Sequence, residues 1–318
     1  MARTEELRVS AGDATLVGTL TLPDGDGRHP NVLLLPSWLP RNRDGSWDRA
    51  THPTWFAPGP PAARGLLARF VDALADAGVA SLRCDPRGCG ASDGEWREVS
   101  LFTRIDDARD MLAAMRSHGA LDLRRAGILG HGEGALVALS VAIGDPAVGA
   151  LTLIGPAARP WQDVLRRGVA ARARHGTDLE HPLVASMDRW SEEVLERAAR
   201  GEVAMDLVLA GGERVRLALA GVEQAMHTPA LALATMLHRS VTIAHGSQDR
   251  WANPDESLLL LGALPDAGAG PRRVVVDGAG HDLAEASDAQ IAALAADLGA
   301  RLQPRDLPPV LLAIEEMG

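Results

Sequence analysis

Residues 126–139 read AGILGHGEGALVAL, an apolar run that breaks into glycines and then resumes with helical character. This stretch has two interpretations. As Gly130-x-Gly132-x-x-Ala135 it matches the fingerprint of a dinucleotide site, in which glycines let a pyrophosphate approach the backbone at a helix N-terminus. As Gly130-x-Gly132-x-Gly134 it matches a sharp strand-to-helix elbow that presents the side chain of its middle residue, and that residue is glycine here. The rest of the chain decides between the two.

Short apolar runs alternate with helical patterns toward both ends of the chain. Such alternation predicts right-handed crossovers and a parallel sheet covered by helices on both faces. Residues 157–238 interrupt the alternation, because they are helical in character, contain no convincing strand and are rich in Arg, Ala and Met. We therefore expect an α/β core from residues 1–156 and 239–318, with a helical lid from residues 157–238. The expected strands are residues 14–22, 31–35, 79–84, 126–130, 148–155, 240–246 and 272–278, and the expected helices are residues 62–77, 103–117, 133–143, a segment after Pro254, and 285–302.

The dinucleotide interpretation lacks its partner residue. Such a fingerprint opens the first strand-helix-strand unit, and an acidic residue about 20 positions further on, at the end of the next strand, binds the ribose. Here several strands come first, and the next strand ends in Leu153-Ile154-Gly155 without an acid. The elbow predicts instead an aspartate after a later strand and a histidine after the last one. Asp249 in IAHGSQDRW and His281 in VVDGAGHDL stand at those places, so we adopt the elbow.

Beyond these residues, the sequence resembles the α/β-hydrolase superfamily over most of its length. It is similar in particular to esterases and peptidase-like hydrolases that carry a PGSGP-x-x-RDG stretch after the third strand and RYDxRGxGxS after the fourth. The corresponding stretches here are LLLPSWLPRNRDGSW, residues 33–47, and LRCDPRGCGASDG, residues 82–94. The resemblance implies an α/β-hydrolase fold, with a mostly parallel sheet, helices on both faces and an inserted helical lid. It also implies ester, thioester or amide substrates and catalytic roles for Asp249 and His281.

The chain departs from this family pattern at two places. Gly132 stands where these hydrolases carry the serine nucleophile, so the usual acyl-enzyme does not form there. In the loop that resembles the oxyanion loop, the letters PSWLP replace a glycine-containing stretch and put Ser37 and Trp38 at the expected site. The backbone N–H of Glu133 remains as an oxyanion donor. The candidate oxyanion and substrate-binding residues are Ser37, Trp38, His131 and Glu133.

Three functions are compatible with a missing serine. First, Asp249 and His281 form the general base of an enzyme that acts on a small acyl or carbonyl compound such as an ester, thioester or lactone. The vacated space then holds a water for direct hydrolysis, or admits a substrate for elimination, cyclisation or isomerisation. Second, the chain is a serine ester or thioester hydrolase with an engineered, inactivating serine-to-glycine change at Gly132. Third, it is a non-catalytic pseudo-hydrolase that binds a ligand. Ser37 and Cys89 are substitute nucleophiles by position, although the loop of Ser37 ordinarily presents backbone donors.

Composition narrows the choice of partners. The formal net charge of −10 argues against nucleic acid and against an anionic membrane surface. The start, MARTEELRV, has charges where a signal peptide needs an apolar core, and no apolar run approaches bilayer length, so we expect a cytoplasmic protein. The two cysteines, Cys84 and Cys89, are too few for a disulfide framework or a complete zinc site. Without a Walker motif or a metal-ligand pattern, we expect no cofactor, no metal and a small-molecule substrate, and the oligomeric state is left open.

Overall fold

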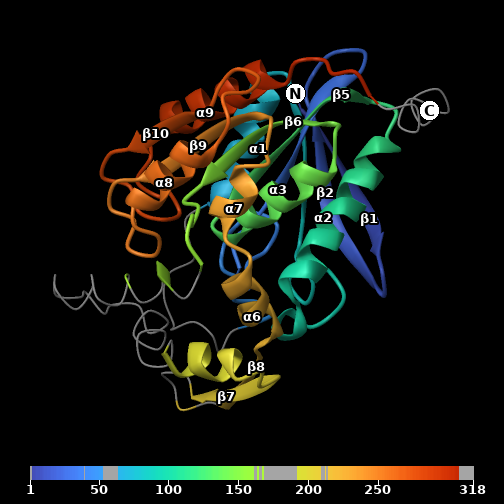
Figure 1. The fold of residues 1–318 in the computed structure, drawn as a ribbon. Coiled ribbons are helices and arrows are strands. Elements are labelled where there is room, and N and C mark those ends of the chain that lie inside the picture. The colour runs from blue at the N-terminus through green and yellow to red at the C-terminus, as the bar shows by residue number, and fades with distance from the viewer. Residues whose placement is uncertain are drawn as a thin grey trace.

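The computed structural model describes residues 2–38, 40–52, 64–160, 163–164, 167, 192–208, 212 and 214–307. Within this part of the chain, eight strands form one sheet in the order β1-β2-β4-β3-β5-β6-β9-β10 (Figure 1). The pairs β1–β2 and β2–β4 are antiparallel, and the other five neighbouring pairs are parallel, so the predicted mostly parallel sheet is present. The strands are β1 (Arg3–Ala11), β2 (Ala14–Leu22), β3 (His29–Leu35), β4 (Ala80–Cys84), β5 (Leu121–His131), β6 (Val148–Ile154), β9 (Ser240–Gly246) and β10 (Arg272–Val276).

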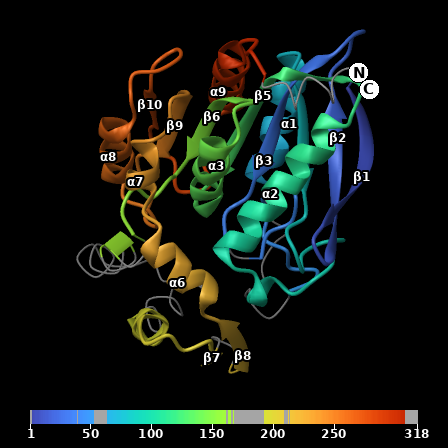
Figure 2. The same cartoon turned by 45° about the vertical axis from the view of Figure 1, so that its right-hand side comes forward.

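Helices cover both faces of this sheet, as Figures 1 and 2 show. Helices α1 and α9 pack on one face, where Phe70 and Leu294 join one buried cluster. Helices α2, α3, α7 and α8 pack on the other, where Leu112 and Leu139 belong to a second cluster. No helix of the described residues is long and apolar enough to cross a membrane. The helices of the core are α1 (Leu66–Asp76), α2 (Leu101–Arg116), α3 (Glu133–Gly144), α7 (Ala230–Ala234), α8 (Asp255–Ala263) and α9 (Asp288–Arg301), and a short 3₁₀ turn, η2, spans Trp96–Glu98.

The expected lid, residues 157–238, is not purely helical. Residues 192–199 and α6 (Ala220–His227) are helical, but β7 (Ala204–Val208) and β8 (Arg214–Ala218) form an antiparallel hairpin between them. The prediction that this insertion contains no strand is therefore wrong. The hairpin is held by the alternate side chains of its strands, since Met205, Leu207 and Leu217 are buried. At the end of the insertion, α7 packs with the core. Of the predicted lid, residues 161–162, 165–166, 168–191, 209–211 and 213 lie outside the described residues.

The carboxyl ends of the parallel strands bring distant loops to one edge of the sheet. β3 leads into the loop of Ser37, β5 into Gly132, β9 into the loop of Asp249 and β10 into the loop of His281. Sites in open α/β sheets lie outside these carboxyl ends. The insertion with its hairpin lies beyond the same edge (Figure 1).

The turn from β5 into α3 depends on backbone atoms that approach one another closely. A Cβ atom at Gly134 would lie 2.6 Å from both the Leu35 and the Pro36 carbonyl oxygens, and one at Gly130 would lie under 3.0 Å from the Gly134 carbonyl oxygen. Real Cβ atoms do not make such contacts with backbone, so both positions require glycine. These two glycines therefore fix how α3 begins against the end of β3.

We expect Gly134→Ala to destabilise the protein, because its methyl group forces α3 away from the loop after β3. Overpacking of this kind typically lowers the free energy of unfolding by about 1–3 kcal/mol. The matched control is Gly262→Ala in α8, where a Cβ meets nothing within 4 Å and the gain in helix propensity is roughly 0.5–1 kcal/mol. Urea unfolding followed by circular dichroism measures both changes. Equal stabilities for the two variants would contradict the close approach.

Candidate active site

The elbow predicted from the sequence is a sharp turn centred on Gly132. β5 ends at His131, α3 begins at Glu133, and Gly132 between them has φ +56° and ψ −118°. Its N–H donates to the Ile154 carbonyl oxygen at 2.8 Å, and its own carbonyl oxygen accepts from the Ala135 N–H at 3.1 Å. The conformation therefore belongs to the framework of the sheet and does not depend on a side chain at residue 132.

Asp249 and His281 meet at the carboxyl edge of the sheet. His281 Nδ1–H donates to Asp249 Oδ2 at 2.8 Å. The other carboxylate oxygen, Oδ1, accepts from the backbone N–H groups of Trp251 at 2.8 Å and Ala252 at 3.0 Å. Because Nδ1 of His281 carries the proton of this hydrogen bond, Nε2 is left with the free lone pair of the imidazole. This is the arrangement of a general base oriented by a carboxylate.

A second histidine supports the same carboxylate. His245, in β9, is fully buried, and its Nε2 lies 3.0 Å from Asp249 Oδ2 and 2.8 Å from the Ala252 carbonyl oxygen. Burial alone would raise the pKa of Asp249, but His281 and His245 together hold it far below its usual value. Burial also opposes protonation of His281, yet the adjacent Asp249 carboxylate raises the pKa of His281 above its ordinary value. The pair thus keeps an ionised carboxylate beside a strengthened base.

The space that a nucleophile would occupy at the elbow is filled by Ser37. A Cβ atom built on Gly132 would lie 3.1 Å from His281 Nε2, so this position faces the base. The same atom would lie 3.0 Å from Ser37 Cβ and under 3.0 Å from Ser37 Oγ, closer than non-bonded atoms come. A side chain at residue 132 would therefore meet the Ser37 hydroxyl, and the expectation that a water is activated at this point stays a prediction. The loop after β3 brings that hydroxyl there.

The backbone N–H and the side chain of Glu133 point to different parts of the structure. Among the described residues its backbone N–H has no acceptor, as an oxyanion donor requires. Its carboxylate turns into the interior, where Arg104 Nη1 lies 3.0 Å away and burial raises the pKa of Glu133. Arg104 Nη2 also donates to the Pro36 carbonyl oxygen at 3.1 Å. The buried carboxylate therefore anchors the loop of Ser37 through Arg104 and does not face the elbow.

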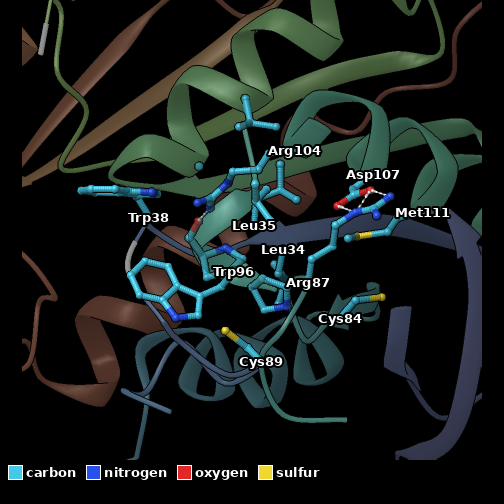
Figure 3. Close-up of a pocket in the computed structure, with 15 residues that line it drawn as sticks. Leu34, Leu35, Trp38, Cys84, Arg87, Cys89, Trp96, Arg104, Asp107 and Met111 are labelled. Carbon is cyan, nitrogen blue, oxygen red and sulfur yellow. Dashed lines mark hydrogen bonds and ion pairs between the residues drawn. The ribbon is translucent and has the colours of Figure 1, made fainter. Parts of the chain in front are cut away.

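Trp38 and His131 lie around the elbow in supporting positions. Trp38 is half-buried, packs against the buried cluster of the insertion and lines the pocket in Figure 3 together with Trp96 and Arg104. His131 has no exposed surface, and its Nε2–H donates to the His281 carbonyl oxygen at 3.2 Å. Burial, with the nearby His281, lowers the pKa of His131 to about 3, so it stays neutral. His131 holds the loop of His281 and has no surface for substrate.

An ion pair that sequence analysis missed joins the two loops that carry Ser37 and His281. Buried Arg41, four residues after Ser37, donates from Nη2 to both carboxylate oxygens of Asp282 at 3.1 Å. Burial would raise the pKa of Asp282, but Arg41 and the two nearby histidines lower it to about 2. The only signal in the sequence was the position of Asp282 directly after His281. Arg41 carries no local signal, because its role depends on a contact across the fold.

The two stretches that carry the family resemblance also meet. Arg43 donates from its backbone N–H to Asp85 Oδ1 at 2.7 Å and from Nη2 to Asp85 Oδ2 at 2.6 Å. Arg83 Nε donates to Asp44 Oδ1 at 2.8 Å. The RDG and DPRG segments therefore stabilise each other behind the loop of Ser37.

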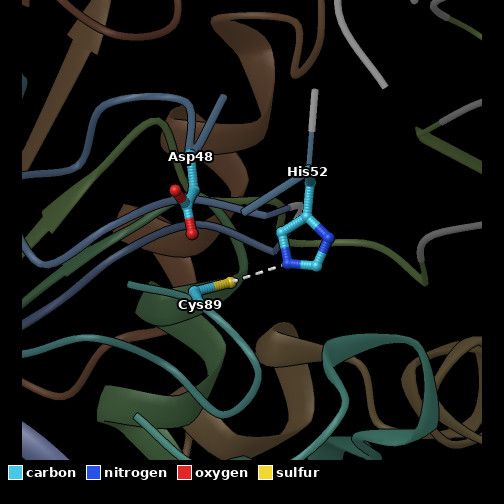
Figure 4. Close-up of side chains that lie close together, drawn as sticks. All are labelled: Asp48, His52 and Cys89. Atoms are coloured by element: carbon cyan, nitrogen blue, oxygen red, sulfur yellow. Dashed lines mark hydrogen bonds between the residues drawn. The ribbon is translucent and has the colours of Figure 1, made fainter. Parts of the chain in front are cut away.

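Asp48, His52 and Cys89 form a cluster with metal-ligand chemistry next to this loop (Figure 4). His52 Nδ1 accepts from Trp96 Nε1–H at 3.1 Å, so the ring proton is on Nε2, which lies 2.6 Å from the Gly88 carbonyl oxygen. Burial, followed by the Asp48 carboxylate, raises the pKa of Cys89 to about 12. A protonated, buried thiol does not fit a substitute nucleophile, and both ring nitrogens of His52 are already engaged in hydrogen bonds.

Comparisons with known proteins agree with this geometry. The family model described as "Serine aminopeptidase, S33" matches residues 57–288. A search of curated proteins found no match. Among solved structures, Est1E from Butyrivibrio proteoclasticus with bound ferulic acid is similar at a TM-score of 0.65 and 15% identity, over 93% of this chain and 98% of that one.

Two further structures show the same fold. The α/β-hydrolase GrgF from Penicillium sp. has a TM-score of 0.64 and 16% identity, over 94% of this chain and 98% of its own. A hydrolase of unassigned activity from Agrobacterium vitis has a TM-score of 0.62 and 18% identity, over 95% of this chain and 100% of its own. The predicted α/β-hydrolase fold is confirmed, and the chain is a hydrolase-like enzyme of that fold.

We expect the pKa values of His281 and His131 to lie on opposite sides of the ordinary histidine value. His281 should titrate above the ordinary histidine value of about 6.5, whereas His131 should stay neutral to about pH 3. Asp249→Asn should lower the pKa of His281, because it removes the negative charge that favours the imidazolium. Histidine ring signals in NMR spectra across pH measure these values.

The same pKa shift has a defined effect on stability. Because the pKa of His281 is higher in the folded protein than in the unfolded chain, its pair with Asp249 stabilises the fold fully below about pH 6.5. This contribution is lost as the pH rises through the folded-state pKa. An unchanged His281 pKa in Asp249→Asn would contradict the described pair.

Proposed function

We propose that this chain, which belongs to the serine aminopeptidase S33 family of α/β-hydrolases, hydrolyses a small acyl compound such as an ester, thioester or lactone. His281 acts as the general base. One observation carries the proposal. The free Nε2 of an imidazole oriented by a buried, ionised carboxylate faces the elbow, 3.1 Å from where a side chain would start at residue 132. That is the place of proton transfer in this fold.

In the proposed reaction, Nε2 of His281 takes a proton from the attacking hydroxyl group as that group adds to the acyl carbon. Asp249 keeps the tautomer and stabilises the imidazolium that forms. The Glu133 N–H then holds the developing oxyanion, a contribution that is typically worth about 10²–10³ in kcat for one donor. His281 finally returns the proton to the leaving group. No metal or organic cofactor takes part in the steps that we propose.

The lining of the elbow favours a short, uncharged acyl group. A cleft beside Gly132 is lined by apolar Leu136, Ala157 and Ala230 and by polar Glu133, Arg159 and Thr228. Arg159 forms an ion pair with Glu256, whose buried carboxylate also accepts from the Ala158 and Arg159 backbone N–H groups at 3.0 Å. The positive charge of Arg159 is thus already compensated. Arg159 therefore has no uncompensated charge with which to bind a carboxylate or phosphate, which favours a neutral substrate.

The alternative of an engineered serine hydrolase has less support. A serine at residue 132 would place its Cβ against both the Cβ and the Oγ of Ser37, so Ser37 would have to move. An ordinary serine hydrolase mutated only at the nucleophile has no reason to carry a second side chain in that position. The intact His281–Asp249 pair likewise argues against a pseudo-hydrolase that only binds a ligand.

We expect the unmodified chain to hydrolyse short p-nitrophenyl esters, and His281→Ala to lose about 10²–10⁴-fold in kcat/KM through loss of the general base. Because a base must be unprotonated, kcat/KM of the unmodified chain should rise with pH through the raised pKa of His281. The control is His238→Ala, which alters an exposed histidine before β9. Release of p-nitrophenol measures the rates.

Product analysis separates hydrolysis from other chemistry of the same base. Mass spectrometry of the products should show the free acid and the alcohol. Turnover that survives His281→Ala undiminished would contradict the proposed base. If the summed mass of the products equals the mass of the substrate, without an added water, the result would favour elimination or isomerisation instead.

A further inference from the structure

We infer that Ser37 is the nucleophile of this enzyme, so that the attacking hydroxyl stands on the loop after β3 and not on the elbow. The inference rests on the proposed function, because it names the group that His281 deprotonates. Its first support is the shared space described above. Ser37 Oγ occupies the volume into which a side chain at residue 132 would point, on the side of His281 Nε2.

The second support is that this hydroxyl is uncommitted. Among the described residues, neither Ser37 Oγ nor His281 Nε2 has a hydrogen-bond partner, and Ser37 is only partly buried. Thr228 lines the cleft beside Gly132, but its Oγ1 already donates to the Gln224 carbonyl oxygen at 2.9 Å. Cys89 is buried, and its pKa is raised to about 12. Ser37 therefore combines partial exposure with a hydroxyl that no other described group holds. The hydrogen bond from Ser37 Oγ to His281 Nε2 that the proposed proton transfer requires forms in the complex with substrate.

The third support is that the loop of Ser37 is held on both sides. On one side, Arg104 donates to the Pro36 carbonyl oxygen and pairs with Glu133 at the start of α3. On the other side, Arg41 pairs with Asp282, the residue next to His281. Both pairs are largely sheltered from solvent. They hold the residue before Ser37 against the elbow and tie its loop to the loop of the base, which is the preorganisation that a nucleophile needs.

The proposed reaction has two steps, acylation of Ser37 and hydrolysis of the acyl ester. Ser37 Oγ forms a bond to the acyl carbon while its proton passes to His281 Nε2, and the carbonyl oxygen becomes the oxyanion. Collapse of this intermediate breaks the bond to the leaving group, which takes the proton from His281 and leaves an acyl ester on Ser37. Water then adds to that ester and gives its proton to His281. The acid departs as Ser37 Oγ recovers the proton.

The test is covalent labelling with an alkyl fluorophosphonate, which marks activated serines without requiring that the substrate be known. The unmodified chain should gain one phosphonyl group, and peptide mapping should place it on Ser37. His281→Ala should label at least about 100-fold more slowly, since the base activates the hydroxyl. Ser117→Ala, which alters an exposed serine at the end of α2, should label like the unmodified chain.

Two variants place the nucleophile. Ser37→Ala should lose the label and at least about 10³-fold in kcat, as removal of a hydrolase nucleophile does. The double change Ser37→Gly with Gly132→Ser relieves the crowding and should move the label to position 132. Circular dichroism and the thermal midpoint establish that each variant folds.

The outcomes separate this inference from the proposed function. A label on Ser37 that depends on His281 supports the inference whichever ester is the substrate. If the unmodified chain hydrolyses esters but gains no label, and Ser37→Ala retains its turnover, His281 activates water; the inference is then overturned and the proposed function stands. If no ester is hydrolysed, the proposed function fails by itself, and absence of label on Ser37 overturns the inference as well.

Discussion

The close approach between the first turn of α3 and the carbonyl groups that end β3 constrains the whole catalytic edge. No Cβ fits at Gly134, because the Leu35 and Pro36 carbonyl oxygens lie 2.6 Å from where it would stand. This contact sets the start of α3 and thereby the direction of the Glu133 N–H. It also presses the chain after β3 against the elbow, so that Ser37 follows directly above Gly132. The oxyanion donor and the hydroxyl are thus placed by the same backbone contact.

Two ion pairs then hold the loop of Ser37 against the start of α3 and against the loop of His281. Arg104 pairs with Glu133, and Arg41 pairs with Asp282, in each case across segments far apart in the chain. Buried ion pairs contribute little net stability, since desolvation of the charges offsets their attraction, whereas removal of one partner is strongly destabilising. Their effect here is geometrical. They allow one arrangement of the loop of Ser37 relative to the loop of His281.

Sequence patterns predicted the parts of this molecule that depend on local order. β9 matches the expected strand at residues 240–246, and α3 begins at the expected residue. The chain order of the elbow, Asp249 and His281 identified two side chains that form a hydrogen bond. β1 was missed because it is a charged edge strand with little buried surface. The β7–β8 hairpin was missed because charged residues interrupt the apolar residues of both strands, AMDLV and RVRLA, so neither forms an apolar run. The sequence placed Ser37 on a loop near the elbow, but it did not place the hydroxyl beside Gly132, because that position depends on tertiary contacts between the loop after β3 and the start of α3.

The position of the Ser37 hydroxyl gives a structural reason for the glycine at residue 132 of the elbow. The Ser37 hydroxyl, as it is oriented here, and a side chain at residue 132 would share one volume beside His281, so a side chain at residue 132 would require Ser37 to turn away. In the proposed mechanism, the absence of a side chain at Gly132 therefore leaves the space through which the Ser37 hydroxyl reaches His281. The elbow keeps what does not depend on its side chain, namely the turn held by the Ile154 carbonyl oxygen and the free N–H of Glu133. A hydrolase framework can in this way retain its base and its oxyanion donor while the hydroxyl moves to a neighbouring loop, because catalysis requires the positions of these groups and not their place in the chain.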